Sequence, residues 1–290
     1  MWDIVIRGAV NGALFALIAV GINLQYGITK ILNVAHGQFL MLGGFITCIL
    51  FNIFRINPLV SLVLGGGVVA VVGVLIYMLV FRRIVYQSKS PEELEVRSLL
   101  ACFGLIFVIQ NALFFMVQRS GISGITSINF LRNMIEIFGV RIELVKIVAM
   151  VVAIILNLVL YAILRFTRMG IALRAVAQEP TGARLVGINI SRYHLISFSL
   201  SAFLGAAAGS LLAMVYYTLS ALQGGGFTFI ALAVIVLGGV GSFIGSLVGG
   251  FIMGYAYYIT LTTELALAMP VVYIILIVTL AIRPKGLFGR

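Results

Sequence analysis

The sequence predicts an all-α polytopic membrane protein with about eight to ten membrane-spanning helices, including discontinuous or re-entrant segments. Of its 290 residues, 62% are hydrophobic and only 9% are charged, and the mean hydropathy is +1.22. A soluble domain carries about 25% charged residues. The apolar residues also form runs of about 20 residues, the length of helix that crosses a bilayer. We therefore expect residues 1–290 to form a single transmembrane domain in the lipid bilayer, with no separate soluble domain.

The predicted crossings follow the apolar runs, at residues 5–25, 31–54, 58–81, 99–118, 142–164, 195–217, 227–260 and 265–282. The seventh run is too long for one crossing, and it contains the glycine-rich stretch 238–242. Because clustered glycines weaken a helix, we expect this run to break there into two crossings or a re-entrant pair. The second run begins with polar residues, so an early broken helix is also expected.

The basic residues predict the orientation in the membrane. Twelve of the nineteen lysines and arginines lie in residues 82–97, residues 165–192 and the tail from 283 to 290. Such residues concentrate in short cytoplasmic loops. An even number of crossings separates each pair of segments, so all three and the C-terminus are expected in the cytoplasm. The N-terminus and an irregular loop at about 119–141 are then expected outside. This placement explains the net charge of +11 without a nucleic-acid partner.

A polar cluster, Thr29, Lys30, Asn33, His36 and Gln38, lies between the first two apolar runs. Polar groups at membrane depth are costly and by default mark a functional site. In one hypothesis Asn33, His36 and Gln38 line a translocation path or gate it by holding a broken helix open. In the other they only satisfy backbone groups where the chain re-enters the membrane. Asn33 and His36 are three residues apart, so on a helix they would share one face.

The basic segment of about 165–193 contains signals for a short helix. Pro180 suits the first helical position, and Glu179 before it favours the positive helix N-terminus. Gly187 is well placed as a left-handed stop. These signals predict a helix of about two turns held outside the bilayer. The residues of interest in this segment are Gly170, Glu179, Pro180, Ala183 and Gly187.

Glycines recur at four-residue intervals in two of the later runs. Gly205 and Gly209 form one pair, and Gly241, Gly245 and Gly249 form a series. Each set would make a flat stripe on one helix face, which permits close helix crossings. We expect these glycines to serve helix packing within one subunit.

Several motifs are missing from the sequence. No G-x-x-x-x-G-K-[ST] motif is present, so this chain is not expected to hydrolyse ATP by that route. No pair of acidic residues forms an obvious catalytic dyad, and the two histidines and two cysteines lack the spacing of a metal site. We therefore expect no enzyme activity, no catalytic residue, and no bound cofactor or metal.

Five segments resemble, in order and spacing, the permeases of branched-chain amino-acid ABC importers. The resemblance is closest to the H member of their usual H and M pair. Urea and amide importers share many of these sequence motifs, and ribose-type sugar permeases are more distant relatives. In many members an acidic residue stands at the position of Gln38, so no role for that carboxylate carries over. The segments are Asn11–Leu17, Tyr26–Gln38, Glu179–Ile188, Gly238–Gly245 and Arg283–Arg290.

The resemblance implies the rest of the transport machine. A second permease chain, of the M type, would pair with this one and leave a path at their interface. Two ATP-binding cassette ATPase subunits, which use ATP and Mg, would dock on segment 165–193 as a coupling loop. An extracytoplasmic substrate-binding protein would deliver branched-chain or related hydrophobic amino acids. The complex would lie in a bacterial or archaeal cytoplasmic (inner) membrane and import by alternating access. A permease of a related ABC importer for urea, amides or sugars is one alternative. Two other classes also stay open: a secondary transporter or channel, which needs no ATPase, and a structural or assembly membrane protein without transport, which would leave the Asn33–Gln38 cluster unexplained.

Overall fold

The computed structural model describes residues 2–120, 128–216, 219–283 and 285–289. Among them, eight helices are long and apolar enough to cross a membrane, and α2 is a shorter apolar helix. The predicted all-α polytopic class is therefore confirmed. The helices are α1 (Trp2–Thr29), α2 (His36–Asn52), α3 (Pro58–Ile76), α4 (Arg82–Gln87), α5 (Pro91–Ser120), α6 (Leu144–Phe166), α7 (Arg168–Gln178), α8 (Pro180–Leu185), α9 (Ile190–Val215), α10 (Gly224–Gly238), α11 (Phe243–Thr263) and α12 (Ala268–Ile282).

Three short helical turns and one hairpin complete the fold. The π-helical turn η1 (Tyr77–Phe81) joins α3 to α4, and the 3-10 turns η2 (Ala221–Gln223) and η3 (Leu265–Leu267) precede α10 and α12. Strands β1 (Met134–Ile137) and β2 (Val140–Glu143) pair antiparallel. They occupy part of the loop predicted at 119–141, whose residues 121–127 lie outside the described residues, as does Arg290 of the basic tail.

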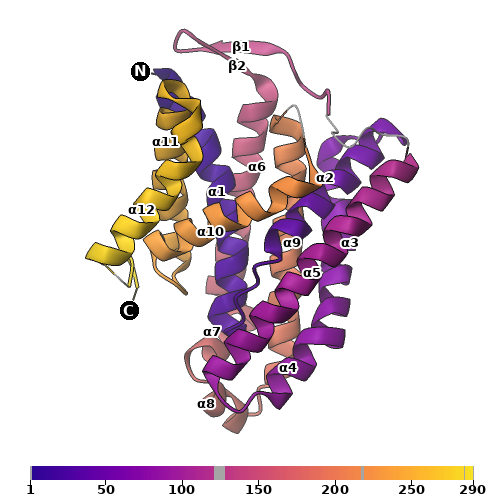
Figure 1. The fold of residues 1–290 in the computed structure, drawn as a ribbon, viewed down its shortest axis with the longest axis vertical. Coiled ribbons are helices and arrows are strands. Elements are labelled where there is room, and N and C mark those ends of the chain that lie inside the picture. Colours follow the sequence, from indigo (N-terminus) through magenta and orange to yellow (C-terminus); the bar gives the residue numbers. More distant parts are fainter. Residues whose placement is uncertain (1, 121–127, 217–218, 284, 290) are drawn as a thin grey trace.

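Two helices form the centre of the molecule. The apolar window of α9 is 83% buried and that of α1 is 72% buried, whereas those of α5 and α12 are each 17% buried. In Figure 1, α1 and α9 run through the middle, with α3 and α5 on one side and α11 and α12 on the other. The N-terminus and the β1–β2 hairpin lie at one end of the bundle, and α7 and α8 lie at the opposite end. The peripheral helices therefore present their apolar faces outward, as a lipid solvent requires.

The long seventh run is interrupted where its glycines predict. Helix α10 ends at Gly238 and α11 begins at Phe243. Between them, Gly239 and Gly241 have φ of +102° and +81°, a region that side chains with a Cβ rarely adopt. Ser242 then caps α11, because its Oγ accepts a hydrogen bond from the Gly245 N–H at 3.0 Å.

The early broken helix is also present, but its geometry corrects one expectation. Lys30 has a φ of +57° and ends α1, with its N–H bonded to the Tyr26 carbonyl at 2.9 Å. Helix α2 begins only at His36, so Asn33 lies in the non-helical connection. The prediction that Asn33 and His36 share one helix face is therefore wrong.

Most of the predicted glycine stripes lie at close helix contacts. A Cβ on Gly209 would overlap the Leu40 carbonyl oxygen of α2, and one on Gly249 would come within 2.7 Å of the Val234 oxygen of α10. Gly245 meets Gly238 in the same way, and Gly205 faces the His36 ring. Gly241 differs from the others, because it lies in the turn before α11 and not on a helix face, and an added Cβ would meet no atom within 4 Å.

Candidate functional site

A polar junction fills the break between α1 and α2. The Asn33 side-chain oxygen accepts a hydrogen bond from the Ala35 N–H at 3.1 Å, and its amide nitrogen donates to Gln25 Oε1 at 3.3 Å. Thr29 Oγ1 donates to the Gln25 carbonyl at 2.9 Å and accepts from the Ile31 N–H at 3.2 Å. These side chains therefore replace the helical hydrogen bonds that the break removes.

The His36 ring lies in a niche made by two glycines. A Cβ on Gly21 of α1 would stand 3.0 Å from the ring Cε1, and one on Gly205 of α9 would stand 2.9 Å from it. Ser201 Oγ of α9 lies 3.4 Å from Nδ1. His36 is fully buried, and the missing side chains of the two glycines provide the space for it.

The start of α2 also meets the start of α10. The Gly37 N–H donates to Thr228 Oγ1 at 2.9 Å, and Thr228 in turn donates to the Gly224 carbonyl at 3.1 Å. A Cβ on Gly224 would stand 2.8 Å from the Gly37 oxygen and 3.0 Å from Gln38 Nε2. The two helices thus touch backbone to backbone at their N-termini.

The structure places all three predicted path residues inside this junction. Asn33 and His36 are 0% exposed and Gln38 is 2% exposed. These three side chains could therefore line a translocation path only if the surrounding helices separated.

A second polar junction depends on Asn23, which the sequence reasoning missed. Asn23 Oδ1 accepts from the Gly241 N–H at 2.6 Å, and its Nδ2 donates to the Ser242 carbonyl at 2.9 Å and to Ser246 Oγ at 2.6 Å. One amide of α1 thereby holds the α10–α11 turn. A polar residue inside an apolar run was a visible signal, but its partners lie more than 200 residues away in the sequence.

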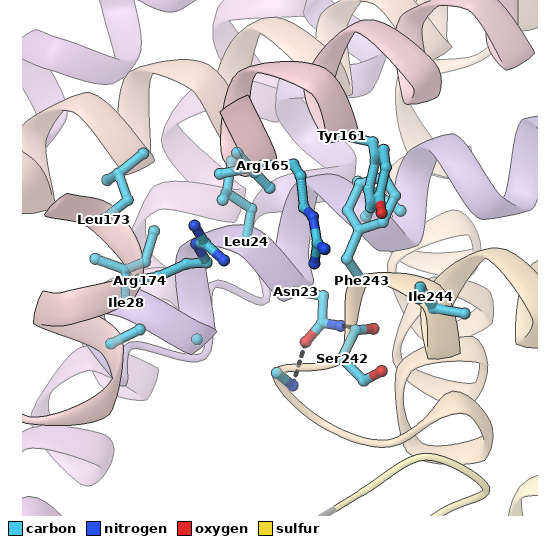
Figure 2. A pocket seen from close by; sticks show the side chains of 15 residues that line it. Asn23, Leu24, Ile28, Tyr161, Arg165, Leu173, Arg174, Ser242, Phe243 and Ile244 are labelled. Atoms are coloured by element: carbon cyan, nitrogen blue, oxygen red, sulfur yellow. Dashed lines mark hydrogen bonds between the residues drawn. The ribbon is translucent and has the colours of Figure 1, made fainter. Parts of the chain in front are cut away.

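A cavity of about 350 Å³ opens beside this second junction, between α1, α6, α7 and the α10–α11 turn. Figure 2 shows the side chains of Arg165 and Arg174 directed into it, with Asn23 and Ser242 on the far wall. The lining residues are Val20, Asn23, Leu24, Gly27, Ile28, Tyr161, Leu164, Arg165, Leu173, Arg174, Ala177, Gly241, Ser242, Phe243 and Ile244.

The third feature is the short helix α8, Pro180–Leu185. Its predicted caps are present, because the Glu179 side chain accepts from the Thr181 N–H at 3.2 Å and Gly187 has a φ of +83°. Ala183 is 4% exposed and holds α8 against the protein, whereas Leu185 is 85% exposed. The helix therefore ends in an exposed apolar tip.

Gly170 positions the start of the same segment. A Cβ on it would overlap the carbonyl oxygens of Ile163 and Leu164, so no larger residue allows α7 to turn back so closely on the end of α6.

The side chains gathered at these features are amides, hydroxyls, one imidazole and two guanidinium groups. Such groups hydrogen-bond neutral ligands and bind anions. Within the part of the chain that the structure describes, no three residues among His, Cys, Asp and Glu cluster as a metal site would require. Cys102 lies with its Sγ 3.5 Å from Asn33 Oδ1, inside the first junction.

Comparison with known proteins decides the family. The protein-family model described as the permease component of the branched-chain amino acid transport system matches residues 4–280. The chain belongs to this permease family. The resemblance read from the sequence is thereby confirmed.

Individual relatives agree over almost the whole length of this permease. It is 29% identical over 292 residues to the high-affinity branched-chain amino acid transport system permease protein LivH of Escherichia coli K12, covering 98% of this chain and 94% of that one. It is 30% identical over 298 residues to the probable branched-chain amino acid transport permease protein LivH of Methanocaldococcus jannaschii, covering 98% of this chain and 92% of that one. The ribose import permease protein RbsC of E. coli K12 is 25% identical, over 83% of this chain and 72% of that protein.

We expect Asn23→Leu to destabilise this permease by about 1–3 kcal/mol, because it leaves buried backbone groups of the α10–α11 turn without partners. Thermal unfolding of the purified protein in detergent measures the effect. Asn111→Leu is the matched control, since Asn111 is exposed and its amide donates to the Phe107 carbonyl of its own helix at 2.8 Å. Equal melting temperatures for the two variants would contradict the role assigned to Asn23.

Proposed function

We propose that this permease is the membrane subunit of an ATP-driven importer of branched-chain or related hydrophobic amino acids. The observation that carries the proposal is the capped helix α8, which presents an apolar tip at one end of the molecule. Leu185 and Val186 are both exposed, in a loop that faces water in this proposal. Burying such apolar surface against a partner protein lowers the free energy, so the pair suits a protein-binding site. Two ATPase subunits that use ATP and Mg are the partners, one on each permease of a pair.

The proposed orientation has α8 in the cytoplasm and the β1–β2 hairpin outside, where the substrate-binding protein docks. Arg168 and Arg174 belong to α7 and Arg184 belongs to α8, the two helices at this end of the bundle, which agrees with the positive-inside rule. The C-terminal tail belongs to the same side. Its Leu287 N–H donates to the Leu237 carbonyl at 2.8 Å, next to the α10–α11 turn that lines the arginine cavity.

Coupling between ATP and transport runs through α9 in this proposal. Helix α8 packs on α7 and α9, and α9 packs in turn on α1, α2 and α3. Ser201 and Gly205 of α9 contact the His36 ring at the start of α2. If the ATPases displace α8 when they close, α9 can transmit this displacement to the first polar junction through these contacts. The two states of the path differ in affinity for the ATPase and substrate partners, which is the source of alternating access.

Relatives favour amino acids over the sugar alternative. Those named for branched-chain amino acids match over 92% and 94% of their length at 29–30% identity, whereas the ribose permease matches over 72% at 25%. A secondary transporter would leave the exposed tip of α8 without a role. ATP-dependent uptake of labelled leucine by the assembled complex tests the proposal directly.

We expect Leu185→Ser combined with Val186→Ser to weaken ATPase docking about tenfold or more, because burying one such side chain contributes about 1.5–3 kcal/mol. Leucine uptake should fall while membrane levels stay normal. Ala183 is unsuitable for this test, since it is buried and a larger residue would disturb the fold. Met134→Ser is the control for ATPase docking alone, as Met134 is 64% exposed in the hairpin at the opposite end. Parental uptake by the double variant would remove α8 as the docking element.

The first junction is proposed as the gate, with Asn33 and His36 holding the broken helix in position. We expect Asn33→Leu and His36→Leu to abolish most leucine uptake while ATPase subunits still co-purify with the permease. Melting temperature separates gating from simple support of the fold. If uptake falls only in proportion to the loss of folded protein, the junction serves the backbone alone and the gating proposal is wrong.

Orientation is tested by cysteine labelling. Arg184→Cys, in α8, should react with an impermeant thiol reagent only after the cells are opened, since arginine-rich loops stay in the cytoplasm. Glu136→Cys, in β1, should react in intact cells. Cys48 and Cys102 are buried and give a low background. The reverse pattern would invert the proposed topology.

A further inference from the structure

We infer that the cavity between α1, α6, α7 and the α10–α11 turn binds the phosphate of an acidic phospholipid from the cytoplasmic leaflet. Its volume of about 350 Å³ is large enough for a headgroup, since small-ligand sites begin at about 300 Å³. The side of the membrane follows the orientation proposed above, but binding itself does not require transport.

The charge of the cavity selects an anion. Arg165 lies in the last turn of α6 and Arg174 lies on α7, and both side chains are directed into the cavity. None of the lining residues is an aspartate or glutamate. Among the described residues neither arginine forms an ion pair within 4.0 Å. Two guanidinium groups that share one cavity suit the bidentate recognition of a phosphate.

The opposite wall adds a smaller positive electrostatic potential to that of the two arginines. Helix α11, 21 residues long, begins at Phe243 in the wall of the cavity, so its positive N-terminal end lies at the site. Asn23 fixes this wall through its bonds to Gly241 and Ser242. The site is therefore already formed around the fixed turn.

The apolar part of the lining points to a lipid as the source of the phosphate. Leu24, Ile28 and Leu164 line the cavity beside the arginines, and Ile244 at its edge is 53% exposed. The arginines and these apolar side chains therefore line the same cavity, beside the end of the apolar helix α6. Basic pockets between transmembrane helices on the cytoplasmic side characteristically bind acidic headgroups. A free phosphate ion would gain nothing from the apolar wall.

The test uses the full-length permease, purified with the subunits that accompany it and placed in neutral phosphatidylcholine nanodiscs. Short-chain phosphatidylglycerol is titrated in, and native mass spectrometry counts the lipid retained by the permease. We expect Arg165→Gln combined with Arg174→Gln to weaken binding about tenfold or more, because charge-assisted hydrogen bonds contribute about 1.5–3 kcal/mol. Arg168→Gln combined with Arg192→Gln removes the same charge from the same segment outside the cavity and should bind as the parent does.

A second variant leaves the charges in place. A Cβ on Gly27 would reach 3.7 Å from the Gly241 Cα, so Gly27→Leu extends into the cavity and should also prevent binding. Inorganic phosphate is titrated in parallel and should not displace the lipid. Parental binding by the cavity variants, or an equal loss in the control pair, would overturn the site. Displacement by inorganic phosphate alone would overturn the assignment to a lipid.

Discussion

The structure depends on one constraint, which is that every backbone polar group at membrane depth must find a partner within the protein. Two helix interruptions inside the membrane domain lie at residues 30–35 and at residues 239–242. An asparagine serves each interruption, Asn33 in the first and Asn23 in the second. Asn23 lies on α1, and Asn33 hydrogen-bonds to Gln25 of that helix. Helix α1 is therefore both a span and the scaffold on which the two discontinuous regions are held.

Local signals in the sequence predicted the parts of this arrangement that depend on local chemistry. Glu179, Pro180 and Gly187 specify the start and end of α8 through capping and a left-handed residue, so nearest neighbours suffice to predict it. The glycine cluster around Gly239 predicts the α10–α11 break for the same reason. Asn33 and His36 show where this reasoning fails. Nothing local requires Lys30 to end α1, because lysine is a good helix former, and the helical spacing assumed for that pair does not exist.

Contacts between distant segments could not be predicted from one sequence. The niche of His36 needs Gly21 and Gly205, which come from two different helices, and the Asn23 bonds to the α10–α11 turn join residues more than 200 positions apart. The four-residue glycine spacing indicated close crossings without saying which helices cross. The resulting backbone contacts, such as that of Gly209 with Leu40, pack α9 closely against α2. Such close packing would couple a movement of α9 to α2, as the proposed role of α9 requires.

Several acidic side chains of the described residues pair with bases, whereas the arginine cavity contains no acid. At the hairpin end, acids and bases are paired, as in Arg7 with Asp3 at 2.6 Å and Arg132 with Glu143 at 2.9 Å. Near α8, Arg165 and Arg174 have no acidic partner among the described residues and face a shared cavity. Paired charges contribute little attraction at a distance, whereas unpaired ones attract anions within about a Debye length. Under the orientation proposed above, this positive charge would face the cytoplasm, and the two arginines are available to acidic groups. Because the arginine cavity adjoins both α7 and the α10–α11 turn, an anion bound there would connect α7 to the second helix interruption.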